Sequence, residues 1–261
     1  MGTRSKPSPD YVTRLKEHWS RYKDQPSRVV YFGEEFTVQP GVFNASEAYT
    51  SRVLIEAVDF VSPGVDVLEM GAGAGIAGIL CVTRAGARSA TLVDRTAAAV
   101  ANSNQNVAAF GLSARCHVVQ SDLFAALPAG EQYDVILFNM PCLELEISAL
   151  LDGIEGHRIP PAYSFADPGY QIIRRFFGEA TGHLRSGGFF LCTFGDFGNR
   201  ALLDDILVQN GLVAECVHRL VDHVHVNQYQ VLHIARIADR AVAVDAKNES
   251  TRAVSPTPTA T

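Results

Sequence analysis

The chain has 261 residues, of which 47% are hydrophobic and 19% charged, so most of it can form a packed core and is not disordered. A formal net charge of −6 disfavours a broad basic groove for nucleic acid, and no apolar run approaches the roughly 20 residues that cross a bilayer. The five cysteines contain no C-x-x-C pair, which predicts neither a disulfide framework nor a zinc site. We expect a cytoplasmic protein with no membrane partner, no nucleic-acid partner and no metal.

Composition divides the chain into three regions. Residues 1–40 are polar and aromatic, and the spacing of Tyr11, Leu15, Trp19 and Tyr22 places them on one helical stripe. This pattern predicts a short helical cap over the functional site. Residues 41–238 alternate strand-like and helix-like runs and form the catalytic domain. Residues 239–261 are small, polar and rich in Pro and Thr, which predicts a disordered tail.

The middle region predicts an α/β fold with a mostly parallel sheet. Strands are expected at 65–70, 89–94, 115–120, 133–139, 187–194, 212–221 and 228–237, and helices at 75–84, 96–109, 169–184 and 198–210. Strands that alternate with helices form βαβ units, whereas the last two strands have no helix between them. The pattern therefore predicts a mostly parallel, seven-stranded sheet that ends in an antiparallel hairpin.

Residues 140–168 interrupt this alternation. Most connections between a strand and a helix have only about 2–6 residues, and longer ones often cover a ligand. The insertion follows the carboxyl end of a predicted strand, which is where open parallel sheets bind their ligands. We predict a substrate lid, in or beside which His157, Asp167 and Tyr170 could assist catalysis.

A glycine-rich loop follows the strand at 65–70 and reads Glu69-Met70-Gly71-Ala72-Gly73-Ala74-Gly75. Glycines permit a tight turn and a close approach of the backbone to a ligand. Asp94 ends the next strand, where a carboxylate can accept hydrogen bonds from ribose hydroxyls. A nicotinamide-binding site is an alternative, because Gly73, Gly75 and Gly78 satisfy G-x-G-x-x-G. Asp94 could instead cap the following helix.

Two later motifs separate these alternatives: Ser121-Asp122-Leu123 follows the third strand, and Asn139-Met140-Pro141-Cys142 follows the fourth. With the glycine loop they resemble the class I S-adenosylmethionine (SAM) methyltransferases, a family with a Rossmann-like fold. The resemblance implies SAM as the cofactor and a nucleoside site. It implies that Glu69 positions the loop, that Gly71 and Gly73 line the methionine part of SAM, that Asp94 holds the ribose, and that Asp122 and Leu123 frame the adenine.

Asn139-Met140-Pro141-Cys142 is similar to the Asn-Pro-Pro-Tyr motif of amino-methyltransferases, which include the release-factor glutamine methyltransferases. Residues 166–175 resemble a downstream segment of that branch. The resemblance implies that Asn139, beside SAM, is the catalytic residue, because its side-chain oxygen and the next backbone carbonyl would accept the hydrogens of the target nitrogen. Met140 and Pro141 would then contact the substrate, and we select Tyr170 as a second catalytic candidate.

Two departures from this branch guide the prediction of the acceptor. Cys142 replaces the aromatic residue that packs on a planar acceptor, and only about 40 residues precede the catalytic domain, in place of a docking domain. We therefore expect an N-methyltransferase that acts on the amine of a small molecule, in natural-product biosynthesis. The alternative is a cyclisation in which SAM itself is the substrate, with azetidine-2-carboxylate and methylthioadenosine as products. A non-enzymatic SAM-binding module is a third reading.

Overall fold

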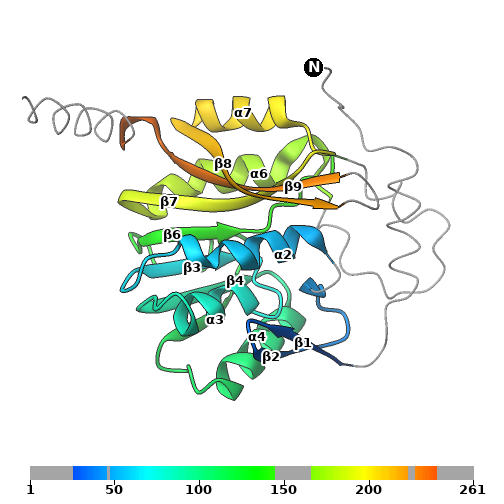
Figure 1. Ribbon diagram of the computed structural model, residues 1–261. Helices are drawn as coiled ribbons and strands as arrows, with labels where there is room; N and C mark the ends of the chain where they lie inside the picture. The colour runs from blue at the N-terminus through cyan, green and yellow to red at the C-terminus, as the bar shows by residue number, and fades with distance from the viewer. Residues whose placement is uncertain (1–25, 46–47, 145–165, 223–226, 240–261) are drawn as a thin grey trace, which may run out of the picture.

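The computed structural model describes residues 26–45, 48–144, 166–222 and 227–239. Within them, seven strands form one sheet in the order β5-β4-β3-β6-β7-β9-β8, in which β8 lies near the top of Figure 1 and β4 below. The bounds are β3 (Asp66–Met70), β4 (Ser89–Asp94), β5 (Cys116–Gln120), β6 (Tyr133–Phe138), β7 (Leu184–Gly195), β8 (Leu212–Asp222) and β9 (Asn227–Arg236). The predicted Rossmann-like α/β fold is confirmed.

The strands from β5 to β7 pair in parallel, and β9 is antiparallel to both β7 and β8. The predicted C-terminal hairpin is therefore confirmed, with β9 inserted between β7 and β8. Chain order reverses at β3, which has β4 on one side and β6 on the other. Open parallel sheets bind ligands outside the carboxyl ends of the strands at such a switch point.

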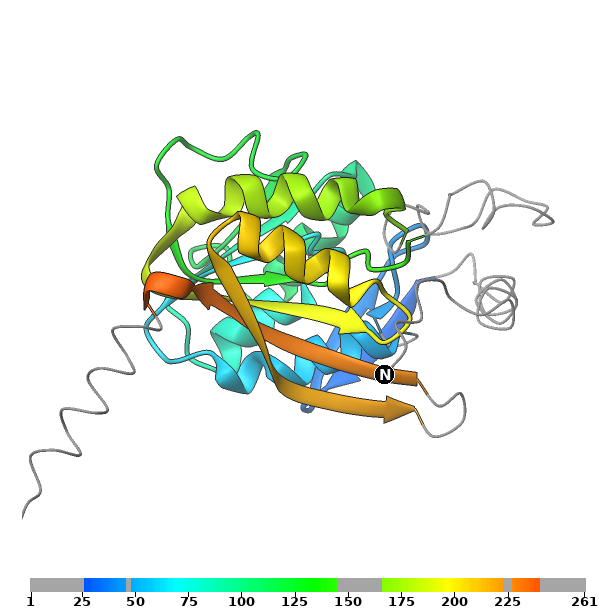
Figure 2. The ribbon, with the colours of Figure 1, turned by 90° about the horizontal axis from the view of Figure 1, so that it is seen from above.

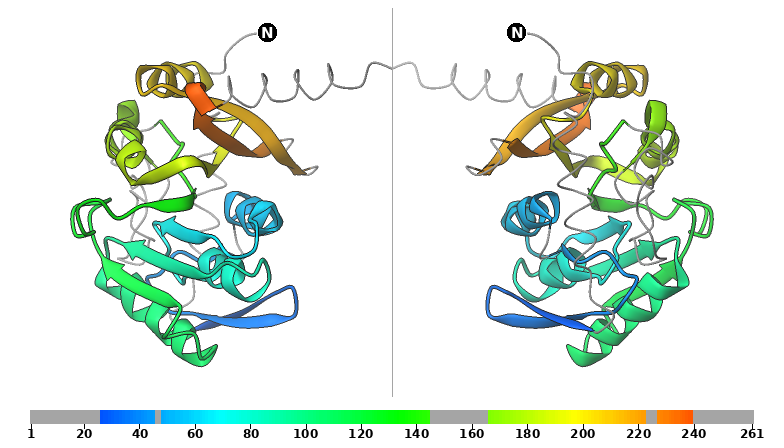
Figure 3. Two further views of the ribbon diagram at one scale, coloured as in Figure 1. Left: turned by 90° about the vertical axis from the view of Figure 1, so that its left-hand side faces the viewer. Right: turned by 90° about the vertical axis from the view of Figure 1, so that its right-hand side faces the viewer.

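Helices cover both faces of the sheet. Figure 3 shows α2 (Tyr49–Glu56) and α3 (Ile76–Thr83) on one side and α6 (Gln171–Ala180) on the other, and Figure 2 shows α6 beside α7 (Arg200–Gln209). The helix α4 (Ala97–Ala109) packs on β4 and β5. Single 3-10 turns occur at η2 (Ala57–Phe60), η4 (Pro168–Tyr170) and η5 (Thr181–His183). No helix of the described ranges is long and apolar enough to cross a membrane.

The amphipathic helix α6 shows how the sequence builds these layers. Ile173, Phe176, Phe177 and Ala180 recur at helical spacing, and all four are buried. The ring of Phe176 lies 4.5 Å from that of Phe138 at the end of β6, measured between centroids. The apolar stripe thus fixes α6 against the strand that carries the Asn139 motif.

A β-hairpin precedes the sheet and was not predicted. In it, β1 (Ser27–Tyr31) pairs antiparallel with β2 (Glu34–Val38) around Phe32 and Gly33, whose φ angles are 51° and 84°. Two positive φ angles are typical of the tight turns that join twisted strands. The described part of the 1–40 segment therefore contains a β-hairpin where a helical cap was expected. Residues 1–25, with the predicted aromatic stripe, lie outside the described residues, as do 145–165 of the lid and 240–261 of the tail.

Two asparagines of α4 bind this hairpin in the way a neighbouring strand would. The side-chain oxygen of Asn106 accepts from the backbone N–H of Thr37 at 3.0 Å, and that of Asn102 accepts from Gln39 at 2.8 Å. Both side-chain amides donate to the carbonyl of Thr37, at 2.9 and 2.8 Å. Buried asparagines need such partners, and these two hold the edge of β2 against α4.

Replacing Gly78 by Ala should destabilise the fold. A Cβ at this position would lie 2.2 Å from Leu92 Cδ2 and 2.9 Å from Glu69 Oε2, so α3 would have to move away from β4. Overpacking of this kind costs about 1–3 kcal/mol. The matched control is Gly178→Ala in α6, where a Cβ meets nothing within 4 Å and should stabilise the helix by about 0.5–1 kcal/mol. Denaturant unfolding measures both changes, and equal effects would contradict the packing argument.

Candidate active site

The glycine loop leads from the end of β3 into α3. Gly71, Gly73 and Gly75 have φ angles of 67°, 58° and 74°, which side chains other than glycine rarely adopt. The backbone N–H of Ala72 donates to the carbonyl of Val93 at 2.9 Å, which ties the loop to β4. These glycines therefore make a tight turn, in which Gly71 and Gly73 line the pocket without a Cβ atom.

Glu69 of β3 supports this loop through a hydrogen bond to α3. Its Oε2 accepts a hydrogen bond from the backbone N–H of Gly78 at 2.8 Å, in the first turn of α3. The carboxyl group is buried, and this burial raises its pKa to about 8, with a smaller contribution from the negative charge of Asp94. Glu69 thus joins β3 to α3, which is consistent with its predicted positioning role.

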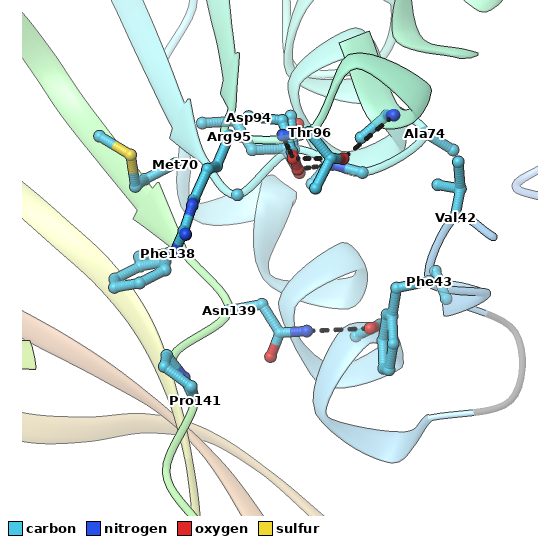
Figure 4. A pocket seen from close by; sticks show the side chains of 18 of the residues that line it. Val42, Phe43, Met70, Ala74, Asp94, Arg95, Thr96, Phe138, Asn139 and Pro141 are labelled. Atoms are coloured by element: carbon cyan, nitrogen blue, oxygen red, sulfur yellow. Dashed lines mark hydrogen bonds between the residues drawn. The ribbon is translucent and has the colours of Figure 1, made fainter. Parts of the chain in front are cut away.

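Asp94 holds the loop from the end of β4. One carboxylate oxygen accepts from the backbone N–H of Gly73 at 3.0 Å, and the other accepts from the backbone N–H and hydroxyl of Thr96, at 2.9 and 3.0 Å. The N-cap of α4 is Thr96, whose hydroxyl accepts from the N–H of Ala99 at 3.2 Å. The cap reading of Asp94 is therefore wrong, and its carboxylate lies in the pocket between the loop and α4 (Figure 4).

Polar side chains of α4 satisfy the carbonyls of the same loop. The hydroxyl of Ser103 donates to the carbonyl of Gly73 at 2.9 Å, and the side-chain amide of Asn106 donates to that of Ala74 at 2.8 Å. Both side chains are buried. The loop is thus fixed by hydrogen bonds before any ligand binds.

The opposite end of the pocket is formed after β5. Asp122 is half exposed and accepts from the guanidinium of Arg175 on α6 at 3.1 Å. Leu123 is buried with a φ angle of 51°, a strained conformation for a leucine. Strained backbone is often found at ligand sites, and both residues line the pocket.

Asn139 follows β6 and lies between two hydroxyl groups. Its Oδ1 accepts from the Thr193 hydroxyl at 2.6 Å, and its Nδ2 donates to the Ser51 hydroxyl at 3.0 Å. Figure 4 shows the amide directed into the pocket across from Phe43. The side chain that the motif predicts to be catalytic is therefore oriented by residues that the motif does not contain.

The structure brings most of the predicted site residues into one pocket at the carboxyl ends of β3 to β6. Predicted residues that line it are Glu69, Gly71, Gly73, Asp94, Asp122, Leu123, Asn139 and Pro141. Lining residues that the sequence analysis missed include Val42, Phe43, Ser51, Phe138, Ile172 and Arg175. Ile172 and Arg175 lie in the 166–175 segment, where neither was given a role, and four of the six missed residues are apolar and look like core in a sequence.

This donor set fits SAM. The Cβ-free turn at Gly71 and Gly73 can admit the methionine part, and carboxylates of Asp94 and Asp122 can accept from hydroxyl and amine groups. The apolar wall of Leu123, Phe138 and Ile172 can cover a base. No metal-binding cluster of His, Cys, Asp or Glu occurs among the residues that the structure describes.

Tyr170 does not reach this pocket, contrary to the prediction that it is catalytic. Its side chain is fully buried, and its hydroxyl donates to the carbonyl of Cys142 at 2.9 Å and accepts from the backbone N–H of Asn199 at 2.7 Å. Burial also raises its pKa far above the usual tyrosine range. Tyr170 therefore joins the end of β6 to the start of α7.

Met140 and Cys142 are also buried, and neither lines the pocket. Any contact of Met140 with substrate would have to come from its backbone. Burial raises the pKa of the Cys142 thiol to about 11, so it is not a thiolate at neutral pH. Because Cys142 does not line the pocket, its replacement of an aromatic residue carries no information on the shape of the acceptor.

Asp167, another candidate from the predicted lid, has a structural role. Asp167 is buried and accepts from the backbone N–H groups of Ile172 and Ile173, both at 3.0 Å, so it caps α6. The ends of the insertion meet, since the N–H of Asp167 donates to the carbonyl of Leu143 at 2.9 Å. His157 lies outside the described residues.

Part of the chain is similar to known methyltransferases. Residues 33–148 match the family model described as the methyltransferase small domain. The release factor glutamine methyltransferase of Cereibacter sphaeroides is 33% identical over 150 residues, which are 57% of this chain and 53% of that protein. The ribosomal RNA small subunit methyltransferase C of Hamiltonella defensa is 31% identical over 131 residues, 50% of this chain and 35% of that protein. The chain spans about half the length or less of these curated relatives.

A solved structure shares the fold. The 16S rRNA N2 G1207 methyltransferase of T. thermophilus, in complex with AdoMet and guanosine, superposes with a TM-score of 0.56. The superposition covers 81% of this chain and 50% of that methyltransferase, at 24% sequence identity. At this identity the likeness shows the fold alone.

Replacing Glu69 by Gln should remove a pH dependence of stability. With a folded-state pKa of about 8 against an ordinary 4.5, Glu69 keeps a proton that the unfolded chain releases. Its stabilising contribution is therefore complete below the lower pKa and is lost as the pH rises through the higher one. The free energy of unfolding of wild type, relative to Glu69→Gln, should fall by up to about 1.4 kcal/mol per pH unit in this window.

Denaturant unfolding of the ligand-free protein between about pH 5 and about pH 8.5 measures this difference. The matched control is Glu179→Gln, an exposed glutamate of α6, which should show no such trend. A wild-type advantage over Glu69→Gln that stays constant with pH would show that Glu69 is ionised in the fold.

Replacing Asp94 by Ala should weaken SAM binding at least about 10-fold, because the change removes an acceptor and frees the N–H of Gly73. Isothermal titration calorimetry measures the dissociation constant. Asp205→Ala, an exposed aspartate of α7, should leave it within about 2-fold. An unchanged affinity in Asp94→Ala would remove Asp94 from the cofactor site.

The comparisons also correct the predicted partners. The expectation of a small-molecule amine, or of SAM alone, with no nucleic acid as partner, is wrong, since the matched relatives are named for a release factor and for ribosomal RNA. Nothing found supports a natural-product role or the cyclisation of SAM. The chain has the Rossmann-like fold that class I methyltransferases share, and residues 33–148 are similar to the methyltransferase small domain.

Proposed function

We propose that this chain is an N-methyltransferase that transfers the methyl group of SAM to the side-chain amide of a glutamine in a protein. The observation that carries the proposal is the position of Asn139, at the end of β6 inside the pocket, with its amide held by Ser51 and Thr193. The similarity to a release factor glutamine methyltransferase supports a protein substrate of the translation machinery.

The chemistry requires orientation more than acid–base catalysis. SAM supplies a methyl group that its sulfonium already makes electrophilic. An amide nitrogen is a weak nucleophile, because its lone pair is delocalised into the carbonyl. Asn139 Oδ1 would accept one N–H of the acceptor and the Met140 carbonyl the other, which directs the nitrogen at the methyl carbon. The N–C bond forms as the C–S bond breaks, S-adenosylhomocysteine leaves, and the proton on nitrogen passes to water.

A cluster of aromatic residues lies at the edge of the sheet that holds the pocket. Tyr49 at the start of α2 stacks on Tyr229 of β9, with ring centroids 5.1 Å apart, and Phe197 contacts Tyr229 edge-on. Tyr229 pairs with Gly195 at the carboxyl end of β7, the edge of the sheet that holds the pocket. Tyr229 and Phe197 are buried, and Tyr49 is the exposed member of the cluster, with the kind of ring on which amides and bases pack.

A base of ribosomal RNA is the second candidate. It is favoured by the 31% identity to a ribosomal RNA methyltransferase over half of this chain. The exocyclic amine of guanine, like an amide, is an NH₂ group on a planar carbon. Asn139 and the Met140 carbonyl could hold it in the same way.

The two candidates are separated by their acceptors. The purified chain is incubated with SAM carrying a labelled methyl group, together with release factors or ribosomal subunits of the source organism. Label in a glutamine-containing peptide supports the first candidate, and label in nuclease-sensitive RNA supports the second. Methylthioadenosine formed from SAM alone, with no labelled macromolecule, would contradict both.

Asn139→Ala should lower kcat on the labelled acceptor at least about 100-fold, since orientation of the nitrogen is lost. SAM affinity should change by less than about 3-fold, because the residues that hold the cofactor remain. The matched control is Asn104→Ala, an exposed asparagine of α4 whose amide donates only to its own helix at Val100, and it should keep wild-type kcat. Full activity in Asn139→Ala would remove Asn139 from the reaction.

A further inference from the structure

Two hydroxyl groups from distant parts of the chain meet at Asn139. Thr193 lies in β7, next to β6 in parallel register, where Phe138 pairs with Cys192. Ser51 approaches from the other side, in the first turn of α2. The three residues are separated by 88 and 54 positions, so only the tertiary fold brings them together.

Both hydroxyls are polar groups in buried positions. Thr193 is fully buried within the apolar run Phe190-Leu191-Cys192-Thr193-Phe194 of β7, and Ser51 is 6% exposed. Burying a hydroxyl is unfavourable unless it forms a hydrogen bond. The Thr193 hydroxyl donates to Asn139 Oδ1 at 2.6 Å, and the Ser51 hydroxyl accepts from Asn139 Nδ2 at 3.0 Å. A valine would fill the space of Thr193 without these polar costs, so the hydroxyl is explained by its bond to Asn139.

The two bonds remove the freedom of the amide while leaving half of its capacity unused. The last torsion of an asparagine side chain is soft, so an amide without partners rotates and can also flip its oxygen and nitrogen. A primary amide has two acceptor sites on Oδ1 and two N–H groups on Nδ2. Ser51 and Thr193 take one of each, which leaves one lone pair of Oδ1 for another hydrogen-bond donor.

We propose that Ser51 and Thr193 are positioning residues that fix the plane and orientation of the Asn139 amide for methyl transfer, a role that rests on the proposed function of Asn139. Thr193 is buried outside the pocket and acts through Asn139, whereas Ser51 holds Asn139 and also lines the pocket. Each hydroxyl can donate or accept. When one is lost, the other can therefore bind either the oxygen or the nitrogen of the amide, and the orientation of the amide is no longer fixed. The two residues should therefore be energetically coupled.

The test compares Thr193→Val, Thr193→Ser, Ser51→Ala and the double variant Ser51→Ala/Thr193→Val. Thr193→Val should lower kcat about 10- to 100-fold with the SAM dissociation constant within about 3-fold, and Thr193→Ser should restore kcat to within about 3-fold of wild type. The effects of Ser51→Ala and Thr193→Val on kcat should not multiply in the double variant. The control is Thr91→Val, which removes another buried hydroxyl from β4 outside the pocket and should leave kcat unchanged.

A spectroscopic measurement on the ligand-free protein separates this proposal from the function of the enzyme. The side-chain amide signals of Asn139 in a ¹⁵N spectrum are assigned by their loss in Asn139→Ala. They should be sharp and slow to exchange with solvent in wild type and Thr91→Val, and shifted and fast to exchange in Thr193→Val. Unchanged signals in Thr193→Val would show that Thr193 does not hold the Asn139 amide and would overturn the proposal. If those signals change while kcat of Asn139→Ala stays at the wild-type value, Thr193 holds the amide but the catalytic role of Asn139, and with it the positioning role, is overturned.

Discussion

The arrangement of the site depends on one constraint, which is that the backbone groups of the glycine loop must find partners without blocking the ligand. Three positive φ angles turn the chain sharply between β3 and α3, so the loop cannot pair with a neighbouring strand along its length. Side chains supply the missing partners: Asp94 and Ser103 bind Gly73, and Asn106 binds Ala74. Ser103 and Asn106 do not line the pocket, whereas the Asp94 carboxylate does, and together they fix the backbone that faces the pocket in advance.

Buried polar side chains connect this loop to the rest of the molecule. Asn106 binds both the loop and β2, so the same residue attaches the N-terminal hairpin and supports the turn. Glu69 joins the turn to α3, and Asp94 joins it to α4 through Thr96. Since each of these groups is costly to bury alone, the pocket, the hairpin and the two helices are stable only together.

The sequence located the pocket through residues that directly follow strands. Asp94, Asp122 and Asn139 each come just after a run of apolar residues, and parallel strands bring such positions to one edge of the sheet. The same reasoning failed for Tyr170 and Cys142. Cys142 belongs to the Asn139 motif and Tyr170 to the 166–175 segment, but both side chains are buried outside the pocket. Position in a motif indicates the region of a residue, whereas the direction of its side chain depends on what the neighbouring helix covers.

The sequence by itself determined the succession of strands and helices along the chain, the sharp turn at the glycines, and which polar residues lie at the carboxyl ends of the strands. These features depend on local periodicity and on the conformational freedom of glycine, which a sequence displays directly. Only the tertiary structure decided that Ser51 and Thr193 hold Asn139, that the asparagines of α4 bind a hairpin, and that Cys142 is excluded from the pocket. Each of these depends on contacts between residues far apart in the chain, and a hydroxyl or an amide shows no sign of its distant partner until the layers have packed.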